Sequence, residues 1–194
     1  NRALYRSLAS SESFAQFMTC VKGELEKEAE ETIKKSAEMQ SPVKIQYLSL
    51  FVGGCLEKGL DISEGGAKYN NYGVHGVGLS NAADALAAIK KTVFDDRSVT
   101  PCRLIAALDA DFDGYGELRN TLLSCPKMGN NDDYVDRIAE ELIDYYSEAF
   151  NGRDNGHGGI WRAGSGSAQS YRTHAAVTGA TADGRHAGDY YACS

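Results

Sequence analysis

Apolar residues recur at helical spacing along much of the chain before residue 150. Residues 11–40 are rich in charge and almost free of glycine, and Ser11 or Ser13 is placed to cap their start, so the sequence predicts one long helix. Residues 45–58 form a second apolar stretch that stops at Gly59, a residue typical of a left-handed helix end. This stretch predicts a second helix.

The clearest helical pattern covers residues 81–94, where alanine, leucine and isoleucine recur every three or four positions. Two lysines fall in the later turns, where the helix dipole favours positive charge, and Ser80 or Asn81 is placed to cap the start. The same periodicity predicts three further helices, over residues 100–110, 115–125 and 131–150.

Two glycine-rich regions break this helical pattern. Residues 63–79 place several glycines among aromatic and amide side chains, which predicts a short strand that leads into a tight turn. In residues 151–194, Gly, Ser, Thr and His replace the helix formers, and only residues 169–177 (QSYRTHAAV) predict a strand. A region this long with little structure of its own is expected to be functional or to pack against further chain.

Composition and charge narrow the class of protein. The 194 residues are 42% apolar and 24% charged, which is typical of a folded globular chain. The 20 basic residues are dispersed among 27 acidic ones, so we expect no nucleic-acid partner. No apolar run approaches the roughly 20 residues that cross a bilayer, so we expect no membrane partner. Five scattered cysteines without a CxxC pair indicate reduced thiols and a cytoplasmic location.

Two ordered blocks resemble the glycyl radical enzymes, the family of pyruvate formate-lyase, glycerol dehydratase and choline trimethylamine-lyase. The first block is GGCLEKGLDISEGGAKYNNYGVHGVGLSNAADALAAIKKTVFDD, residues 53–96, which contains EGGA, YN, GVG, N-AD-L and AIKK in the family's order. The second is TGATADGRHAGD, residues 178–189, which is similar to the family's G-x-T-x-DGR-x-G turn. With the connecting segments, the resemblance covers most of residues 45–194.

The resemblance implies a helix-rich α/β fold that forms part, the second half, of a ten-stranded barrel. Residues 1–44 are then expected to be a long helix flanking the barrel. Residues 45–194 are expected to be one structural unit, a half-barrel segment of the catalytic domain.

The resemblance also implies a chemistry for the complete enzyme. A glycyl radical, installed by a separate radical S-adenosylmethionine activating enzyme, generates a thiyl radical on a catalytic cysteine, and the thiyl abstracts hydrogen from the substrate. The expected activity is that of an anaerobic radical lyase or dehydratase, which cleaves C–O, C–N or C–C bonds of a small polar metabolite. Formate C-acetyltransferase activity is the alternative within the family. Complete members are commonly homodimers.

Two family motifs are absent from this sequence. Neither the radical hairpin R-V-x-G-Y nor the cysteine loop G-C-x-E-P occurs in it, so no catalytic residue is assigned to this chain. Cys55 lies in a partial match, Gly54-Cys55-Leu56-Glu57, but Lys58 follows where proline is required, which favours a buried helical thiol. The chain is therefore expected to be an internal segment of a larger enzyme, or one piece of a split enzyme, and inactive alone. The remainder of the barrel is then its first partner.

The resemblance places residues 169–174, within the predicted strand, on a barrel strand that ends beside the catalytic cysteine, where family members contact substrate. Strand alternation points either Ser170, Arg172 and His174 or Tyr171 and Thr173 into the pocket, and the sequence leaves this register open. The candidate substrate residues are Ser170, Tyr171, Thr173 and His174. Asp183, Gly184 and Arg185 are expected to form a structural turn with a salt link.

Other patterns offer weaker alternatives. Asp109, Asp111 and Asp113 precede Gly114 at the spacing of a calcium loop, which suggests a non-catalytic helical calcium-binding module, but Asn120 stands where a bidentate glutamate is required. A phosphate cradle at Gly73, Gly76 and Gly78 lacks the lysine of such motifs, and a structural strand-to-helix turn is favoured. The four histidines lack a zinc-binding spacing, and we expect no metal.

Overall fold

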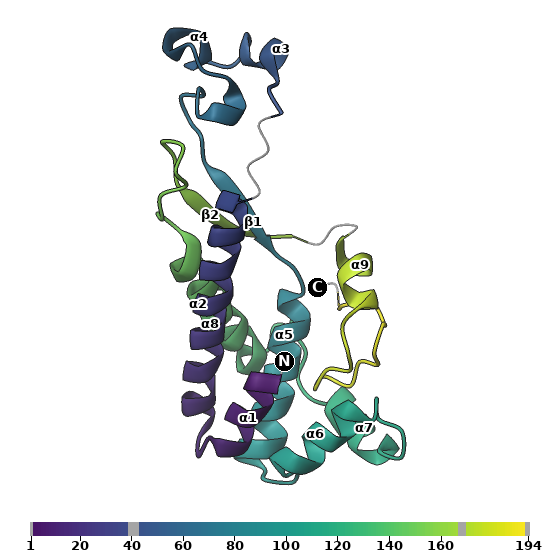
Figure 1. The fold of residues 1–194 in the computed structure, drawn as a ribbon. Coiled ribbons are helices and arrows are strands. Elements are labelled where there is room, and N and C mark those ends of the chain that lie inside the picture. Colours follow the sequence, from purple (N-terminus) through teal and green to yellow (C-terminus); the bar gives the residue numbers. More distant parts are fainter. Residues whose placement is uncertain (1, 39–42, 167–169, 193–194) are drawn as a thin grey trace. The chain divides into compact units, whose positions relative to one another are not determined.

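The computed structural model describes residues 2–38, 43–166 and 170–192 (Figure 1). The chain is rich in helices, as its periodicity predicts, and its contacts divide it into two compact units. The first unit comprises residues 1–24, 76–145 and 165–194, and the second comprises residues 25–75 and 146–164. The expected organisation, a helical flank over 1–44 and a half-barrel segment over 45–194, remains a prediction about the complete protein.

The first unit is built from helices around an apolar core. Leu104 and Leu122 have no exposed surface in this core, and Met18 is 2% exposed. α1 packs against α6, and Thr100 caps α6 by accepting a hydrogen bond from the Arg103 amide. Its helices are α1 (Arg2–Ser10), α5 (Leu79–Ile89), α6 (Pro101–Asp109), α7 (Gly116–Leu123), α9 (Ser170–Ala176), the start of α2 (Phe14–Glu38) and most of α8 (Asp133–Phe150).

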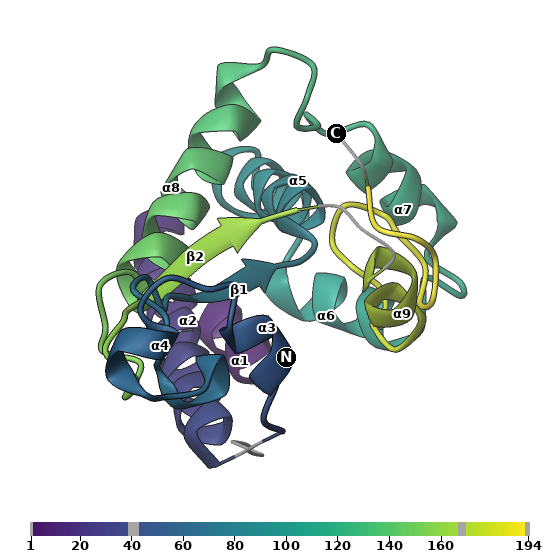
Figure 2. The same ribbon diagram turned by 90° about the horizontal axis from the view of Figure 1, so that it is seen from above.

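The second unit holds all but the last residue of each of the two strands in the described chain. β1 (Tyr72–Gly76) pairs with β2 (Trp161–Ser165), and Figure 2 shows the two arrows side by side and pointing the same way. A cluster around Trp161, Phe150 and Ala29 packs against the pair. The unit also contains the single-turn helices α3 (Gln46–Ser49) and α4 (Cys55–Lys58) and the 3-10 turn η1 (Ile62–Glu64).

The turn from β1 into α5 depends on a glycine. Gly78 has φ +84° and precedes the first turn of α5, a conformation that costs a side-chain-bearing residue energy because of its Cβ. Ser80 or Asn81 was expected to cap this helix. That prediction is wrong, because α5 begins at Leu79 and Gly78 takes the cap position. α5 continues into a π-helical turn, η2 (Lys90–Asp95), so the long helix predicted over 81–94 is confirmed in extent but not in type.

The long helix predicted for residues 11–40 is confirmed as α2, and it begins after one of the two predicted caps. A separate helix, α1, precedes it and ends at Ser10, and Ser13 then accepts a hydrogen bond from the Gln16 amide at 3.2 Å. Ser13 is therefore the cap of α2, one of the two candidates. α2 reaches Glu38, and residues 39 and 40 lie outside the described residues.

The helix predicted for residues 45–58 is wrong. Gly53 and Gly54 interrupt it, and Gly54 adopts φ +101°, so that α3 and α4 are separate single turns. Its predicted end is confirmed, because Gly59 terminates α4 in the left-handed conformation.

The strand predicted for residues 169–177 is wrong as well. Residues 170–176 form helix α9, and residue 169 lies outside the described residues. Ala175 is fully buried in this helix, and alanine is the strongest helix former. The short apolar run was therefore interpreted with strand alternation where helical periodicity applies. The strand in this region is β2, which begins nine residues before α9 and which the sequence analysis missed.

Candidate functional site

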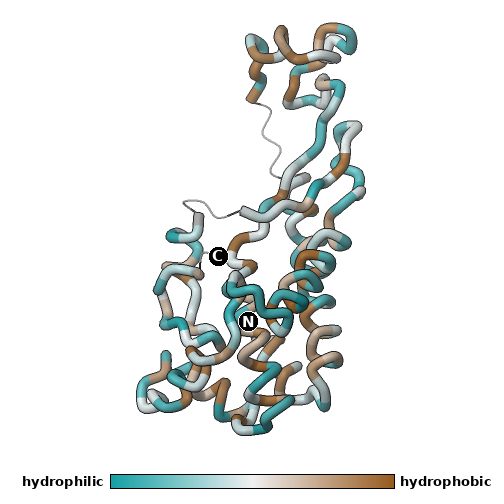
Figure 3. Tube along the Cα trace, turned by 180° about the vertical axis from the view of Figure 1, so that it is seen from behind, coloured by the Kyte–Doolittle hydropathy of each residue, from teal (hydrophilic) through white to brown (hydrophobic). Residues whose placement is uncertain are grey.

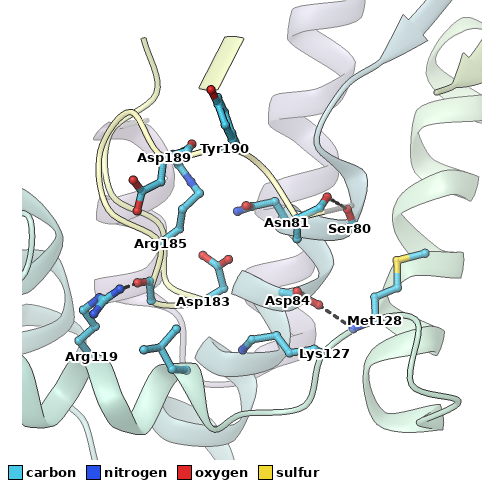
Figure 4. A pocket seen from close by; sticks show the side chains of 13 residues that line it. Ser80, Asn81, Asp84, Arg119, Lys127, Met128, Asp183, Arg185, Asp189 and Tyr190 are labelled. Carbon is cyan, nitrogen blue, oxygen red and sulfur yellow. Dashed lines mark hydrogen bonds between the residues drawn. The ribbon is translucent and has the colours of Figure 1, made fainter. Parts of the chain in front are cut away.

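A polar pocket of about 410 Å³ lies in the first unit, against the DGR turn (Figure 4). Three parts of the chain line it: the N-terminal half of α5, α7 with the loop that follows, and residues 183–192. The lining residues are Ser80, Asn81, Asp84, Arg119, Leu123, Lys127, Met128, Asp183, Gly184, Arg185, Asp189, Tyr190 and Ala192.

The start of α5 supplies three buried polar side chains. The Ser80 hydroxyl donates to the Ala192 carbonyl at 2.6 Å, and the Asn81 amide donates to Thr181 Oγ1 at 3.1 Å. Asp84 Oδ1 accepts from the Met128 amide at 2.7 Å (Figure 4). Because these bonds reach two distant parts of the sequence, α5 serves as the anchor for both. Asn81 Oδ1 is buried and has no hydrogen-bond partner among the described residues.

Arg185 organises the DGR turn from inside. Its guanidinium donates from Nε to Thr181 Oγ1 at 3.1 Å and from Nη1 to the Asp189 carbonyl at 2.7 Å. Nη2 donates to the carbonyls of Thr178, at 3.3 Å, and Gly179. The guanidinium carbon also lies 5.2 Å from the centre of the Tyr191 ring, within cation–π range. One buried cation therefore ties together both ends of residues 178–189.

Backbone hydrogen bonds close the same turn. The Thr181 amide donates to the Arg185 carbonyl at 3.1 Å, the Gly184 amide donates to the Thr181 carbonyl at 3.0 Å, and Gly184 has φ +94°. Within the described residues no ion pair joins Asp183 to Arg185, so the expected salt link is not observed there: Asp183 accepts from the Thr181 hydroxyl, and Arg185 bonds to carbonyls and that hydroxyl. Arg119 adds a bond from Nε to the Gly184 carbonyl at 2.9 Å.

The pocket also perturbs the ionisation of Asp84. Burial raises the pKa of this carboxyl above its usual range, and the neighbouring Asp183 adds to the increase. The Met128 amide and the Lys127 ammonium act in the opposite direction. Lys127 itself donates to the carbonyls of Leu122, at 3.0 Å, and Cys125, at 3.2 Å, and so holds the loop after α7. The pocket is therefore a hydrogen-bonded polar centre that fixes three chain segments.

The predicted substrate residues lie elsewhere in the first unit. Tyr171 is half-buried on α9 with its ring 5.8 Å from that of Tyr191, and Thr173 and His174 are exposed. None of these three lines the polar pocket, and the side chain of Ser170 lies outside the described structure. Because α9 is a helix, the two alternating strand faces between which the sequence analysis left the register open do not exist.

The calcium-loop sequence has a different role. Asp111 Oδ1 accepts from the Ala187 amide at 2.8 Å and lies 3.2 Å from His186 Nδ1, and these two contacts lower the pKa of Asp111, the first more strongly. Its carboxylate therefore holds the segment after Arg185. In the described part of the chain, no three His, Cys, Asp or Glu side chains are grouped to bind a metal ion.

The remaining sequence candidates take structural places. Cys55 is 3% exposed in the first turn of α4, which confirms a buried helical thiol. Gly73 and Gly76 lie in β1 and Gly78 precedes α5, as expected of a strand-to-helix turn. Across residues 2–38, 43–166 and 170–192, no helix is long and apolar enough to cross a membrane.

The sequence analysis missed most of the pocket. Asn81 and Asp84 were visible as the spacing N-x-x-D at the start of a predicted helix, where residues three apart share one face. The contributions of Arg119, Lys127 and Asp189 had no such signal, because they depend on contacts between segments that are distant in the sequence.

Comparison with known proteins identifies the class to which this fold and turn belong. A family model described as pyruvate formate lyase-like matches residues 5–173. The chain therefore belongs to the pyruvate formate lyase-like family of glycyl radical enzymes.

Individual relatives agree with this assignment. The chain is 41% identical, over 116 residues, to trans-4-hydroxy-L-proline dehydratase of Clostridioides difficile; the match covers 59% of this chain and 15% of that protein. It is 36% identical, over 148 residues, to the probable dehydratase YbiW of Escherichia coli K12; this match covers 72% of this chain and 18% of that protein.

A solved structure extends the agreement to the fold. The glycerol-bound form of the B12-independent glycerol dehydratase from Clostridium butyricum matches with a TM-score of 0.88 and 33% identity, over 95% of this chain and 24% of that one. The predicted fold class is confirmed: the chain is a helix-rich partial segment of a glycyl radical enzyme barrel. It spans less than a fifth of the length of the curated relatives described above.

Proposed function

We propose that this chain is a segment of an anaerobic glycyl radical enzyme, a dehydratase or lyase that cleaves a C–O, C–N or C–C bond of a small polar metabolite. The observation that supports this most strongly is the match of 95% of the chain to a glycerol dehydratase at a TM-score of 0.88. Dehydration is favoured over the other reactions because relatives at 41%, 32% and 36% identity are all named as dehydratases.

In the proposed enzyme, the radical chemistry belongs to parts of the polypeptide outside these 194 residues. A glycyl radical, installed by a radical S-adenosylmethionine activating enzyme, supplies hydrogen abstraction from the substrate. The described residues contribute rigidity: Arg185 and α5 hold residues 178–189 through buried hydrogen bonds. A segment fixed in this way keeps the adjoining barrel wall in one position, and reactions between positioned groups depend on such accuracy. The proposal includes a cytoplasmic, homodimeric complete enzyme.

We also propose that α9 faces the substrate in the complete enzyme, through Ser170, Tyr171, Thr173 or His174. The exposure of His174 supports this, since an exposed polar side chain on a barrel element can contact a ligand. A His174→Gln variant of the complete enzyme tests it. A rise in KM with unchanged radical yield is expected, and an unchanged KM for this variant and for Thr173→Val and Tyr171→Phe variants would contradict it.

The activity is tested on the complete protein, activated anaerobically by its radical S-adenosylmethionine enzyme. The activated protein is incubated with glycerol, 1,2-propanediol, trans-4-hydroxy-L-proline and isethionate, and separately with pyruvate and coenzyme A. We expect loss of water from one of the hydroxylated substrates, detected by mass spectrometry of the products. Formate and acetyl-coenzyme A from pyruvate would establish formate C-acetyltransferase activity instead. A fully activated protein that transforms none of these compounds or other small polar metabolites would contradict the proposal.

A further inference from the structure

One face of the β1–β2 pair packs against helices of the same unit. Trp161 of β2 is buried among side chains of α2 and α8, and its ring lies 5.5 Å from that of Tyr72 of β1. Val74 and Ala163 pack against the same cluster. Helices surround the strands of an α/β barrel, so this face of the pair is the outer face of the barrel wall.

Strand alternation then defines the inner face of the barrel wall. Successive side chains of a strand point to opposite sides, so the residues between the outer positions point toward the barrel interior. His75 and Gly164 share this side, because a Cβ at Gly164 would lie 3.4 Å from two atoms of the His75 ring. Because packing fixes the outer face, the inner face is fixed whether or not further chain covers it. The inner face consists of Gly73 and His75 from β1 and of Arg162 and Gly164 from β2.

The inner face of the described strands carries a permanent positive charge and no carboxylate. Arg162 and His75 are its two polar residues, and neither forms a hydrogen bond or an ion pair with the described part of the chain. A guanidinium stays charged at physiological pH, and its place in a barrel interior is unfavourable unless an anion compensates the charge. Its planar fork matches the two oxygens of an oxyanion. Arg162 is therefore suited to bind an oxyanion inside the barrel.

Glycine leaves room between the two polar side chains. Figure 2 shows β1 and β2 pointing the same way, so Gly73 lies next to Arg162, as Gly164 lies next to His75 two residues further along each strand. A Cβ at Gly73 would meet no heavy atom within 4 Å. A small molecule that binds over Gly73 can therefore contact both Arg162 and His75.

We propose that Arg162 and His75 are specificity-determining residues of the complete enzyme, and that its substrate is a small metabolite with an oxyanion group such as a carboxylate or a sulfonate. Arg162 binds the oxyanion through paired hydrogen bonds, and His75 forms a hydrogen bond with a hydroxyl of the same molecule. This inference rests on the proposed function, because it names the substrate class of that enzyme. It favours acidic metabolites over neutral polyols.

Turnover by the activated complete protein tests the role of Arg162. Trans-4-hydroxy-L-proline and isethionate carry an oxyanion, whereas glycerol and 1,2-propanediol do not, and we expect the higher kcat/KM with an oxyanion compound. Arg162→Gln is expected to raise the KM for that compound about tenfold to a hundredfold at unchanged radical yield, because hydrogen bonds between charged groups are lost. Arg162→Lys should restore part of the affinity. The matched surface variant Arg137→Gln, whose partner is the exposed Asp133, should leave the KM unchanged.

Two results would overturn the inference. A higher kcat/KM for glycerol or 1,2-propanediol would show that no oxyanion is selected. A lower Tm for Arg162→Gln with the parental KM would show that the counter-charge is a carboxylate of the protein itself. Gly73→Ala gives an independent readout: its methyl group occupies the space over the strand, so the KM should rise several-fold without loss of Tm, and His75→Gln should raise the KM less than His75→Ala does.

Calorimetric titration of the unactivated complete protein with the same four compounds needs no radical. We expect an oxyanion compound to bind and Arg162→Gln to weaken this binding about tenfold or more. Absence of oxyanion binding, or binding that the variant leaves unchanged, would overturn the inference. A protein that binds an oxyanion through Arg162 but forms no glycyl radical would contradict the proposed function alone, so the two failures are distinguishable.

Discussion

Arg185 shows how one buried cation can define a turn through hydrogen bonds to backbone carbonyls. It is 7% exposed, and its charge is compensated by the carbonyls of Thr178, Gly179 and Asp189. Charge-assisted hydrogen bonds of this kind are stronger than those between neutral groups, and the planar fork of arginine reaches several acceptors at once.

Arg185→Lys in the complete protein is therefore expected to destabilise residues 178–189, because an ammonium cannot reach all these acceptors. The loss is about 3 kcal/mol, or roughly a hundredfold faster amide exchange in this segment, measured by hydrogen–deuterium exchange. The control is Arg172→Lys, since Arg172 is exposed and lies 5.5 Å from the Tyr190 ring. Equal exchange in both variants would contradict the role of Arg185.

Asp84 predicts a pH dependence of stability. Its folded pKa is raised by burial, so its contribution to stability is fully present below the ordinary aspartate pKa of about 4 and is lost as the pH rises through the folded value. Asp84→Asn keeps an acceptor for the Met128 amide and removes this loss. The Tm difference between variant and parent should therefore shift in favour of the variant from pH 4 to pH 7, and a difference that does not change with pH would contradict the role of the buried carboxyl.

The sequence foretold part of this site. The resemblance placed Asp183, Gly184 and Arg185 in a structural turn, and the described geometry fits a turn, yet the partners of Arg185 were unforeseen. Backbone carbonyls carry no sequence identity, so no pattern of residues could indicate that they, and not Asp183, accept from the guanidinium.

At the scale of the elements, prediction succeeded where one strong local signal acted alone. α6 and α8 follow clear periodicity, and β1 follows its glycine-rich alternation. It failed where local signals conflicted. Residues 45–58 have helical apolar spacing, but Gly53 and Gly54 interrupt the helix. α9 was predicted as a strand because seven residues are too few to distinguish helical from strand periodicity. β2 was missed because its partner β1 lies some 90 residues away, as the bond from the Tyr72 amide to the Ile160 carbonyl shows.

The pairing of β1 with β2 depends on a close backbone approach. A Cβ on Gly159 would lie 1.8 Å from the Asn70 carbonyl oxygen, so Gly159→Ala forces the backbones apart. We expect a local destabilisation of about 2 kcal/mol or more, seen as faster exchange of the Tyr72 amide. Gly73→Ala is the control, because a Cβ at that glycine of β1 meets nothing within 4 Å. Unchanged exchange in Gly159→Ala would contradict the described pairing.

At the scale of the whole molecule, the chain is one part of a longer architecture. It matches about a quarter of the chains of solved glycyl radical enzymes. It carries a polar centre at the DGR turn, and several exposed hydrophobic side chains lie in residues 43–60 (Figure 3). The family could be inferred from the two sequence blocks. The exposure of the hydrophobic side chains in residues 43–60 could not, because single turns with outward hydrophobic side chains have the same local pattern as a buried helix.

Electron paramagnetic resonance of the complete protein tests most directly whether these residues belong to a working glycyl radical enzyme. The protein that contains these residues is activated anaerobically with a radical S-adenosylmethionine enzyme and a reductant, and the spectrum is recorded. We predict the doublet of a glycyl radical, which disappears on exposure to air together with activity. Absence of any organic radical, while a known glycyl radical enzyme is activated by its own partner under the same conditions, would contradict the account.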